Sequence, residues 1–293
     1  MGNKYLTLIP SNWLFNASVI GFLKFVKKSG IYNNFEEKVN ELLQDDGSLK
    51  LDTEIFEKIY PKARELYLLG GNQESEKSIL ESRILGKNDT YNNYLHPTYL
   101  KSNKSYFEDT IKYLSEIEES DRGNDCIICY NGKYIPESKF ENLPEEVRKF
   151  LNSLSHPSMK LNNFLFGSLG EFPNSFWNCS NDSKICHLCS YLLIHHHLAM
   201  TKLNGETYKP QIFINSNSFK TMWYFSELLG EYSKLEKLEN IKYLAIPLLK
   251  LNMKVLSSLY SEESDLEVIY YYKRGKEILP KSFILKQNVS KIL

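Results

Sequence analysis

Two cysteine pairs are the residues of this sequence best suited to bind a metal ion. They are Cys126-Ile-Ile-Cys129 and Cys186-His-Leu-Cys189. A Cys-x-x-Cys turn directs two sulfur atoms at one ion, and two such turns supply the four tetrahedral thiolates of a structural Zn²⁺ site. Because four thiolates leave no coordination position open for a substrate, the pattern predicts a structural rather than a catalytic ion.

The two pairs lie far apart in the sequence. Residues 130–185 separate them, whereas compact zinc ribbons place about 15–20 residues between their pairs. A shared ion would hold together the ends of a long excursion and lower the entropy cost of ordering it. Two alternatives stay open: unrelated pairs of reduced thiols, or a redox motif, although no βαβ pattern accompanies either pair. Disulfides are disfavoured because nothing indicates secretion.

Other candidate metal ligands are less well placed. Cys179 is the fifth cysteine, and we expect it to pack as a small apolar residue, with replacement of a ligand as the alternative. His187 lies inside the second pair and points away from an ion that both flanking cysteines bind. His195, His196 and His197 are consecutive, and successive helical side chains point about 100° apart, so the three cannot converge on one ion.

The sequence lacks the common signatures of catalytic sites. It contains no Gly-x-x-x-x-Gly-Lys phosphate loop, no His-Glu-x-x-His motif and no zinc-deaminase signature. Acidic pairs such as Glu36-Glu37 and Glu145-Glu146 fall in predicted helices, where they are typical of solvated faces. We therefore expect a protein that is not an enzyme, and an enzyme with a site scattered in sequence stays as an alternative.

Composition and charge exclude several classes of protein. Of 293 residues, 42% are apolar and 25% are charged, which is typical of a globular chain and not of a disordered or collagen-like one. The 36 basic and 36 acidic side chains balance, which argues against a strongly basic, free-standing nucleic-acid-binding protein. A local basic patch near the C-terminus offers candidate phosphate contacts, with an ordinary solvated face as the alternative. These candidates are Lys273, Arg274, Lys276 and Lys281.

The most apolar stretch, Trp13–Val26, predicts a buried helix in a cytoplasmic protein. It is shorter than the roughly 20 apolar residues that a transmembrane helix needs. It also lacks the basic start and the cleavage site of a signal peptide. Ser11 or Asn12 can cap this helix, which we expect over residues 13–28.

Periodicity, capping residues and β-forming runs predict the other elements. Helices are expected over 35–44, from 52 or 53 to 70 with a break at Pro61, over 106–117 after a Ser105/Glu108 capping box, and over 144–154, 188–203, 219–229 and 241–259. Residues 155–183 predict an irregular loop. Strands are expected over 211–215 and 266–273, the second paired with 282–286 across a turn at Arg274-Gly275.

Together these elements predict an α+β fold that is predominantly helical, with a zinc-knuckle insertion and a small C-terminal β element. Three regions are expected. Residues 1–120 form a mainly helical N-terminal region, 121–205 a zinc-binding region with its long excursion, and 206–293 a mixed C-terminal region.

The opening helix and the two knuckles together resemble a known family. The helix Trp13-Leu-Phe-Asn-Ala-Ser-Val-Ile-Gly-Phe-Leu23 and the second knuckle running into Cys186-His-Leu-Cys-Ser-Tyr-Leu-Leu-Ile194 are similar to the CXXC–CXXC family of CRISPR-associated proteins. This family is the large subunit of type I-B and related I-A interference complexes, called Cascade. The resemblance covers roughly residues 10–290. The chain is shorter than the expected members, which carry a C-terminal helical bundle.

The resemblance implies a non-catalytic role in antiviral defence. Such a subunit joins Cascade proteins around a CRISPR RNA, helps recognise the target-adjacent motif in double-stranded DNA, and supports strand displacement for a recruited helicase-nuclease. RNA–DNA pairing reads the remaining sequence. Only the four paired cysteines carry over residue by residue. The alternative reading is a zinc-stabilised protein-interaction module unrelated to nucleic acid.

Overall fold

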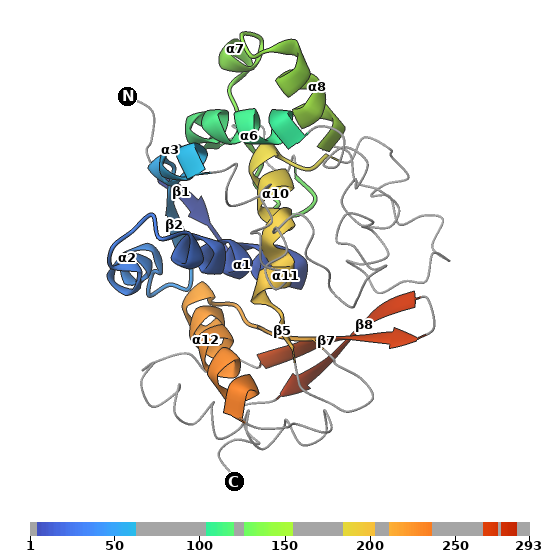
Figure 1. The fold of residues 1–293 in the computed structure, drawn as a ribbon. Helices are drawn as coiled ribbons and strands as arrows, with labels where there is room; N and C mark the ends of the chain where they lie inside the picture. Colours follow the sequence, from blue (N-terminus) through green and yellow to red (C-terminus); the bar gives the residue numbers. More distant parts are fainter. Residues whose placement is uncertain are drawn as a thin grey trace, which may run out of the picture.

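The computed structural model of the chain combines helices with small antiparallel sheets (Figure 1). The structure describes residues 5–62, 104–119, 126–154, 184–202, 211–235, 266–274 and 277–285. Within these ranges helices predominate, and the largest sheet is built from the C-terminal strands. The predicted α+β, predominantly helical class is therefore confirmed. The region boundaries at 120/121 and 205/206 stay predictions.

The elements have the following bounds. The helices are α1 (Trp13–Ser29), α2 (Phe35–Leu42), α3 (Glu54–Ile59), α6 (Lys104–Tyr113), α7 (Glu137–Phe140), α8 (Glu145–Leu154), α10 (His187–Leu192), α11 (His196–Ala199) and α12 (Phe219–Leu235), with 3₁₀ turns η1 (Tyr60–Lys62), η4 (Leu114–Glu116) and η6 (Leu193–His195). The strands are β1 (Tyr5–Leu8), β2 (Leu49–Asp52), β3 (Glu118–Glu119), β4 (Lys133–Tyr134), β5 (Thr201–Lys202), β6 (Gln211–Asn215), β7 (Leu266–Arg274) and β8 (Glu277–Leu285). Strand β1 pairs with β2 and β3 with β4, and the larger sheet has the order β5-β6-β7-β8.

Helix α1 is the central element of the core. The Asn12 side chain caps it by accepting a hydrogen bond from the Phe15 N–H at 3.0 Å. Gly30 ends it in the left-handed conformation, with φ of 63°. Because most side chains between these caps are buried, α1 has neighbours on nearly every side. Figure 1 shows the α10–α11 segment crossing α1, with the paired strands β1 and β2 nearby.

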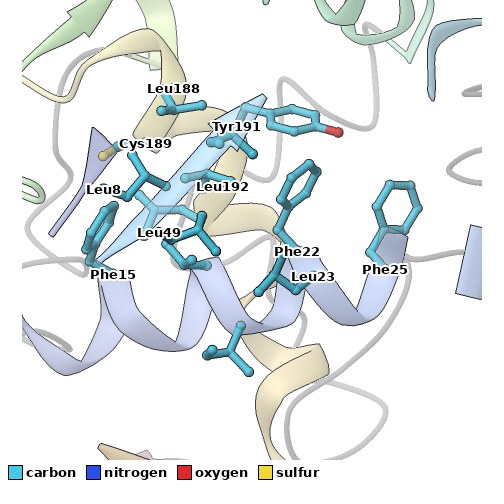
Figure 2. Packing of buried hydrophobic residues seen from close by; sticks show 14 of the residues in the cluster. Leu8, Phe15, Phe22, Leu23, Phe25, Leu49, Leu188, Cys189, Tyr191 and Leu192 are labelled. Atoms are coloured by element: carbon cyan, nitrogen blue, oxygen red, sulfur yellow. The ribbon is translucent and has the colours of Figure 1, made fainter. Parts of the chain in front are cut away.

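Aromatic rings join α1 to the helical segment that follows the second cysteine pair. The Phe22 ring contacts those of Tyr191 and His195, with centroids 5.8 and 5.3 Å away. On another side Phe22 packs against Phe56 of α3. Figure 2 shows Phe22 and Phe25 extending from the same side of α1, with Tyr191 nearby on α10. Burial of such rings contributes strongly to a core, so this contact fixes α10 relative to α1.

The buried Asn16 connects α1 to the C-terminal sheet. Its Nδ2 donates to Asn215 Oδ1 on β6 at 2.8 Å, and its Oδ1 accepts from the Ser11 N–H at 2.8 Å. Asn215 in turn donates to the Glu267 carboxylate on β7 at 2.9 Å. A buried amide must be hydrogen-bonded. Asn16, the polar residue within the apolar stretch, therefore positions the C-terminal sheet relative to α1.

Most of the predicted elements are confirmed within the described residues. These are the helices that became α1, α2 and α8, the start of α12, strand β6, and the β7–β8 hairpin, in which Arg274 lies opposite Glu277. The helix that begins at Glu54 changes to a 3₁₀ turn that contains Pro61, as the proline predicts. Two further predictions, the loop over 155–183 and the helix over 241–259, lie outside the described residues.

Two expectations are corrected, and one pair of strands was not predicted. Ser105 lies inside α6, which begins at Lys104, so it is not the N-cap, because a cap needs non-helical backbone angles. The helix expected over 188–203 is divided by η6 and ends at Ala199, and Thr201 begins β5 against β6. The β1–β2 pair was not expected, because each strand has only four residues.

None of the described helices combines the length and apolar character needed to cross a bilayer.

Candidate metal centre

The first cysteine pair forms a tight turn between β3 and β4. The Tyr130 N–H donates to the Cys126 carbonyl at 2.9 Å, and Tyr130 has a φ of 59°. A left-handed residue after the second cysteine closes the turn, at a steric cost for a side chain as large as tyrosine. The Ile127 N–H donates to the Lys184 carbonyl at 3.0 Å. The turn is therefore paired with the segment that leads to the second pair.

The second cysteine pair lies at the start of α10. Cys186 is the N-cap, and its sulfur accepts a hydrogen bond from the Cys189 N–H at 3.4 Å. The Cys186 N–H points at the first pair and donates to Cys126 Sγ at 3.3 Å. Backbone N–H groups at a helix start favour negative charge. This position therefore suits thiolates.

The four sulfur atoms converge on one point. All lie within 4.8 Å of one another, and Cys129 Sγ is 3.8 Å from Cys186 Sγ. A tetrahedron with metal–sulfur bonds of about 2.3 Å has edges of about 3.8 Å, so this separation suits a shared Zn²⁺. Cys126, Cys186 and Cys189 are buried and Cys129 is partly exposed. The arrangement can hold a metal ion through four cysteines.

Burial and mutual hydrogen bonding give the thiols unequal acidities. Burial raises the pKa of the Cys186 and Cys189 thiols well above the ordinary value. At Cys126 burial acts in the same direction, but hydrogen bonds from the other three cysteines and from the Cys186 N–H hold its pKa well below that value. Cys126 is thus the thiol of this group whose ionised form is favoured. Entry of the ion then displaces the remaining protons, so metal binding should weaken as pH falls.

A comparison with known protein families found a match to one segment of the chain. Residues 146–201, which contain the second cysteine pair and α10, match the model of the CRISPR-associated protein family Cas_CXXC_CXXC. This segment of the chain is similar to the CRISPR-associated CXXC–CXXC family. The first cysteine pair, Cys126 and Cys129, precedes the matched segment, and the fold brings it to the second pair. No curated protein and no solved structure is significantly similar to the chain.

The other candidate residues that the structure describes are not part of the sulfur cluster. His187 accepts a hydrogen bond from the Ile135 N–H at 3.1 Å and stacks on Phe140. Among the described residues, the four cysteines form the one group that could hold a metal ion, and the three consecutive histidines are not part of it. Lys273 and Arg274 lie in β7, and Lys281 is exposed on β8. Cys179 and Lys276 are outside the described residues.

Residues at the start of α1 hold the first cysteine turn, Cys126–Cys129, in place. The sequence analysis did not predict this contact. Ile128 O, inside the Cys-x-x-Cys turn, accepts from Asn12 Nδ2 at 2.8 Å and from Ser11 Oγ at 3.1 Å. The same Asn12 side chain caps α1 through its Oδ1. Asparagine carries both a donor and an acceptor, and this is the one signal in the sequence that could have indicated the double contact.

We expect Asn12→Ala to loosen metal binding as well as to destabilise α1. Loss of the cap costs about 1 kcal/mol, and leaving the Ile128 carbonyl with fewer donors costs about 1 kcal/mol more. The matched control is Asn34→Ala, which removes the cap of α2 alone. Chemical denaturation and the rate of Zn²⁺ loss to a chelator measure the two effects. Equal rates of zinc loss in both variants would contradict the support role.

His195 should make the folded protein sensitive to acid. Burial lowers its pKa to about 3, so the imidazole stays neutral in the fold while the unfolded state takes up a proton below about 6.5. The stability contributed by the neutral imidazole is fully present above about pH 6.5 and is lost as pH falls toward 3. Between pH 7 and 5 the wild type should lose about 2 kcal/mol more than His195→Gln. Unfolding curves at several pH values measure the difference, and parallel profiles would refute it.

Proposed function

We propose that this protein is the non-catalytic large subunit of a CRISPR-associated type I-B, or related I-A, Cascade complex in the cytoplasm. In this role it helps recognise the target-adjacent motif in double-stranded DNA. It also supports strand displacement for a recruited helicase-nuclease. The observation that carries the proposal is the family match together with the convergence of both cysteine pairs on one point.

The chemistry of the cysteine cluster supports a structural Zn²⁺ rather than a reaction centre. Four sulfur ligands complete a tetrahedron and leave no position for water or substrate. The cluster joins the β3–β4 turn to α10, which packs on α1 through Tyr191 and Phe22. An ion held there stabilises a scaffold, and the protein's task is then binding and positioning.

Co-expression with the other Cascade subunits and a CRISPR RNA tests the assignment. The tagged chain should copurify with the RNA and its proteins, and the assembly should bind matched double-stranded DNA less tightly as salt rises. Purification without RNA or Cascade proteins would contradict the proposal. A protein partner retained regardless of RNA, DNA and salt would instead identify an interaction module.

Lys281→Ala should weaken DNA binding by the assembly. Lys281 is exposed on β8, beside the strand that carries Lys273 and Arg274. Losing one phosphate contact should reduce the slope of log K against log salt by about 0.9 for duplex DNA. Lys149→Ala on α8, where the side chain is 74% exposed, is the matched control. Identical slopes for Lys281→Ala and the wild type would exclude Lys281 as a phosphate contact.

A further inference from the structure

Lys133 is a buried lysine close to the sulfur cluster. Only 2% of it is exposed, in strand β4. Its Nζ donates to the Asn131 carbonyl at 3.1 Å and lies 3.7 Å from the Glu119 carboxylate. Taking an ammonium group out of water is costly unless a well-placed opposite charge compensates. Glu119 is 45% exposed and at ion-pair rather than close hydrogen-bond distance, so it offsets that cost only in part.

The Asn131 carbonyl connects Lys133 to the cluster. Cys129 Sγ donates to the same oxygen at 2.9 Å. Because both contacts end on one atom, Lys133 Nζ lies no further from Cys129 Sγ than the sum of 2.9 and 3.1 Å, about 6 Å. Cys129 is also the least buried of the four sulfurs. The buried positive charge therefore faces the side of the cluster that is nearest to solvent.

A metal-loaded cluster would need such a charge. Four thiolates around a divalent cation leave an excess of two negative charges, which is costly in a buried site. Cys129 would bind a metal ion as a thiolate, which has no proton to donate to the Asn131 carbonyl. Lys133 would then be the donor to that oxygen. We propose that Lys133 is the charge-balancing residue of the metal centre and holds the Cys129 side of the turn in place. This inference rests on the proposed metal site.

Neutral substitutions at Lys133 test the inference. Lys133→Met removes the charge, and Lys133→Gln removes the charge but keeps a donor for the Asn131 carbonyl. Lys149→Met removes an exposed lysine and is the control. Zn²⁺ affinity is measured by competition with a chelating dye. The Co²⁺-loaded proteins report the thiolate-to-metal charge-transfer band, which a purely structural role of Lys133 would not move.

Both Lys133 variants should bind Zn²⁺ about 10- to 100-fold more weakly than the wild type. Their charge-transfer band should move to lower energy, because the thiolate electrons lose a stabilising positive charge. The Lys149→Met protein should match the wild type. Wild-type affinity and an unmoved band in either Lys133 variant would overturn the inference while leaving the metal site intact.

A second substitution covers the case in which both Lys133 variants fail to fold. Glu119→Gln changes a half-exposed side chain and keeps Lys133. Because it removes the competing negative charge, the band should move to higher energy and Zn²⁺ should be held at least as tightly. A band that stays in place or moves the other way would overturn the inference. Wild-type protein that binds no metal would refute the metal site and this inference together.

Discussion

Cys186→Ser should abolish stoichiometric metal binding and lower the free energy of unfolding by about 4 kcal/mol, because metal-binding energy in a structural site is folding energy. The melting temperature should fall by about 10 °C. Serine is a better N-cap than cysteine, so the hydrogen bond from the Cys189 N–H at the start of α10 can be kept. The loss can then be assigned to the missing ligand rather than to the helix.

Metal analysis and thermal unfolding of the two proteins, with and without chelator, measure this effect. Chelator should destabilise the wild type and leave Cys186→Ser nearly unchanged. Cys179→Ser, which changes the cysteine outside both pairs, is the control and should retain the ion. Wild-type metal content and melting temperature in the Cys186→Ser protein would show that the four cysteines do not form a metal site.

Gly21→Ala should destabilise the protein by about 3 kcal/mol or more, although alanine is the better helix former. A Cβ at this position would lie only 1.9 Å from His195 O and 2.7 Å from the His195 carbonyl carbon. Both are backbone atoms, so no side-chain rotation relieves the clash and α1 must move away from the α10–α11 segment. Because Cys186 caps α10 and Cys189 lies within it, metal retention should weaken as well.

Gly230→Ala in α12 is the matched control, since a Cβ there would meet no atom within 4 Å. It should stabilise the protein by up to about 1 kcal/mol through helix propensity alone. Chemical denaturation of the two variants should therefore give changes of opposite sign. Stabilisation by Gly21→Ala would show that the close approach of α1 to His195 does not exist in solution.

Local chemistry in the sequence was enough to predict several elements of the fold. Helix α1 follows from its apolar spacing and from a cap at Ser11 or Asn12, of which the structure uses Asn12. The β7–β8 hairpin follows from two β-forming runs on either side of Gly275. Local signals failed to predict the elements whose structure depends on contacts with residues distant in the sequence. The four-residue strands β1 and β2 depend on each other, and the helix after Cys189 is divided where α1 crosses it at Gly21.

For the candidate metal centre, the sequence by itself determined which side chains are the candidate ligands and that they come in two pairs, because a Cys-x-x-Cys turn can direct two sulfur atoms at one ion. Only the tertiary structure decided that residues so far apart share one point, through the Ile127 contact with Lys184 and the packing of α10 on α1. It alone placed Asn12 and Lys133 beside the cluster. Such contacts join residues distant in the chain, and no local pattern encodes which polar side chains become buried together.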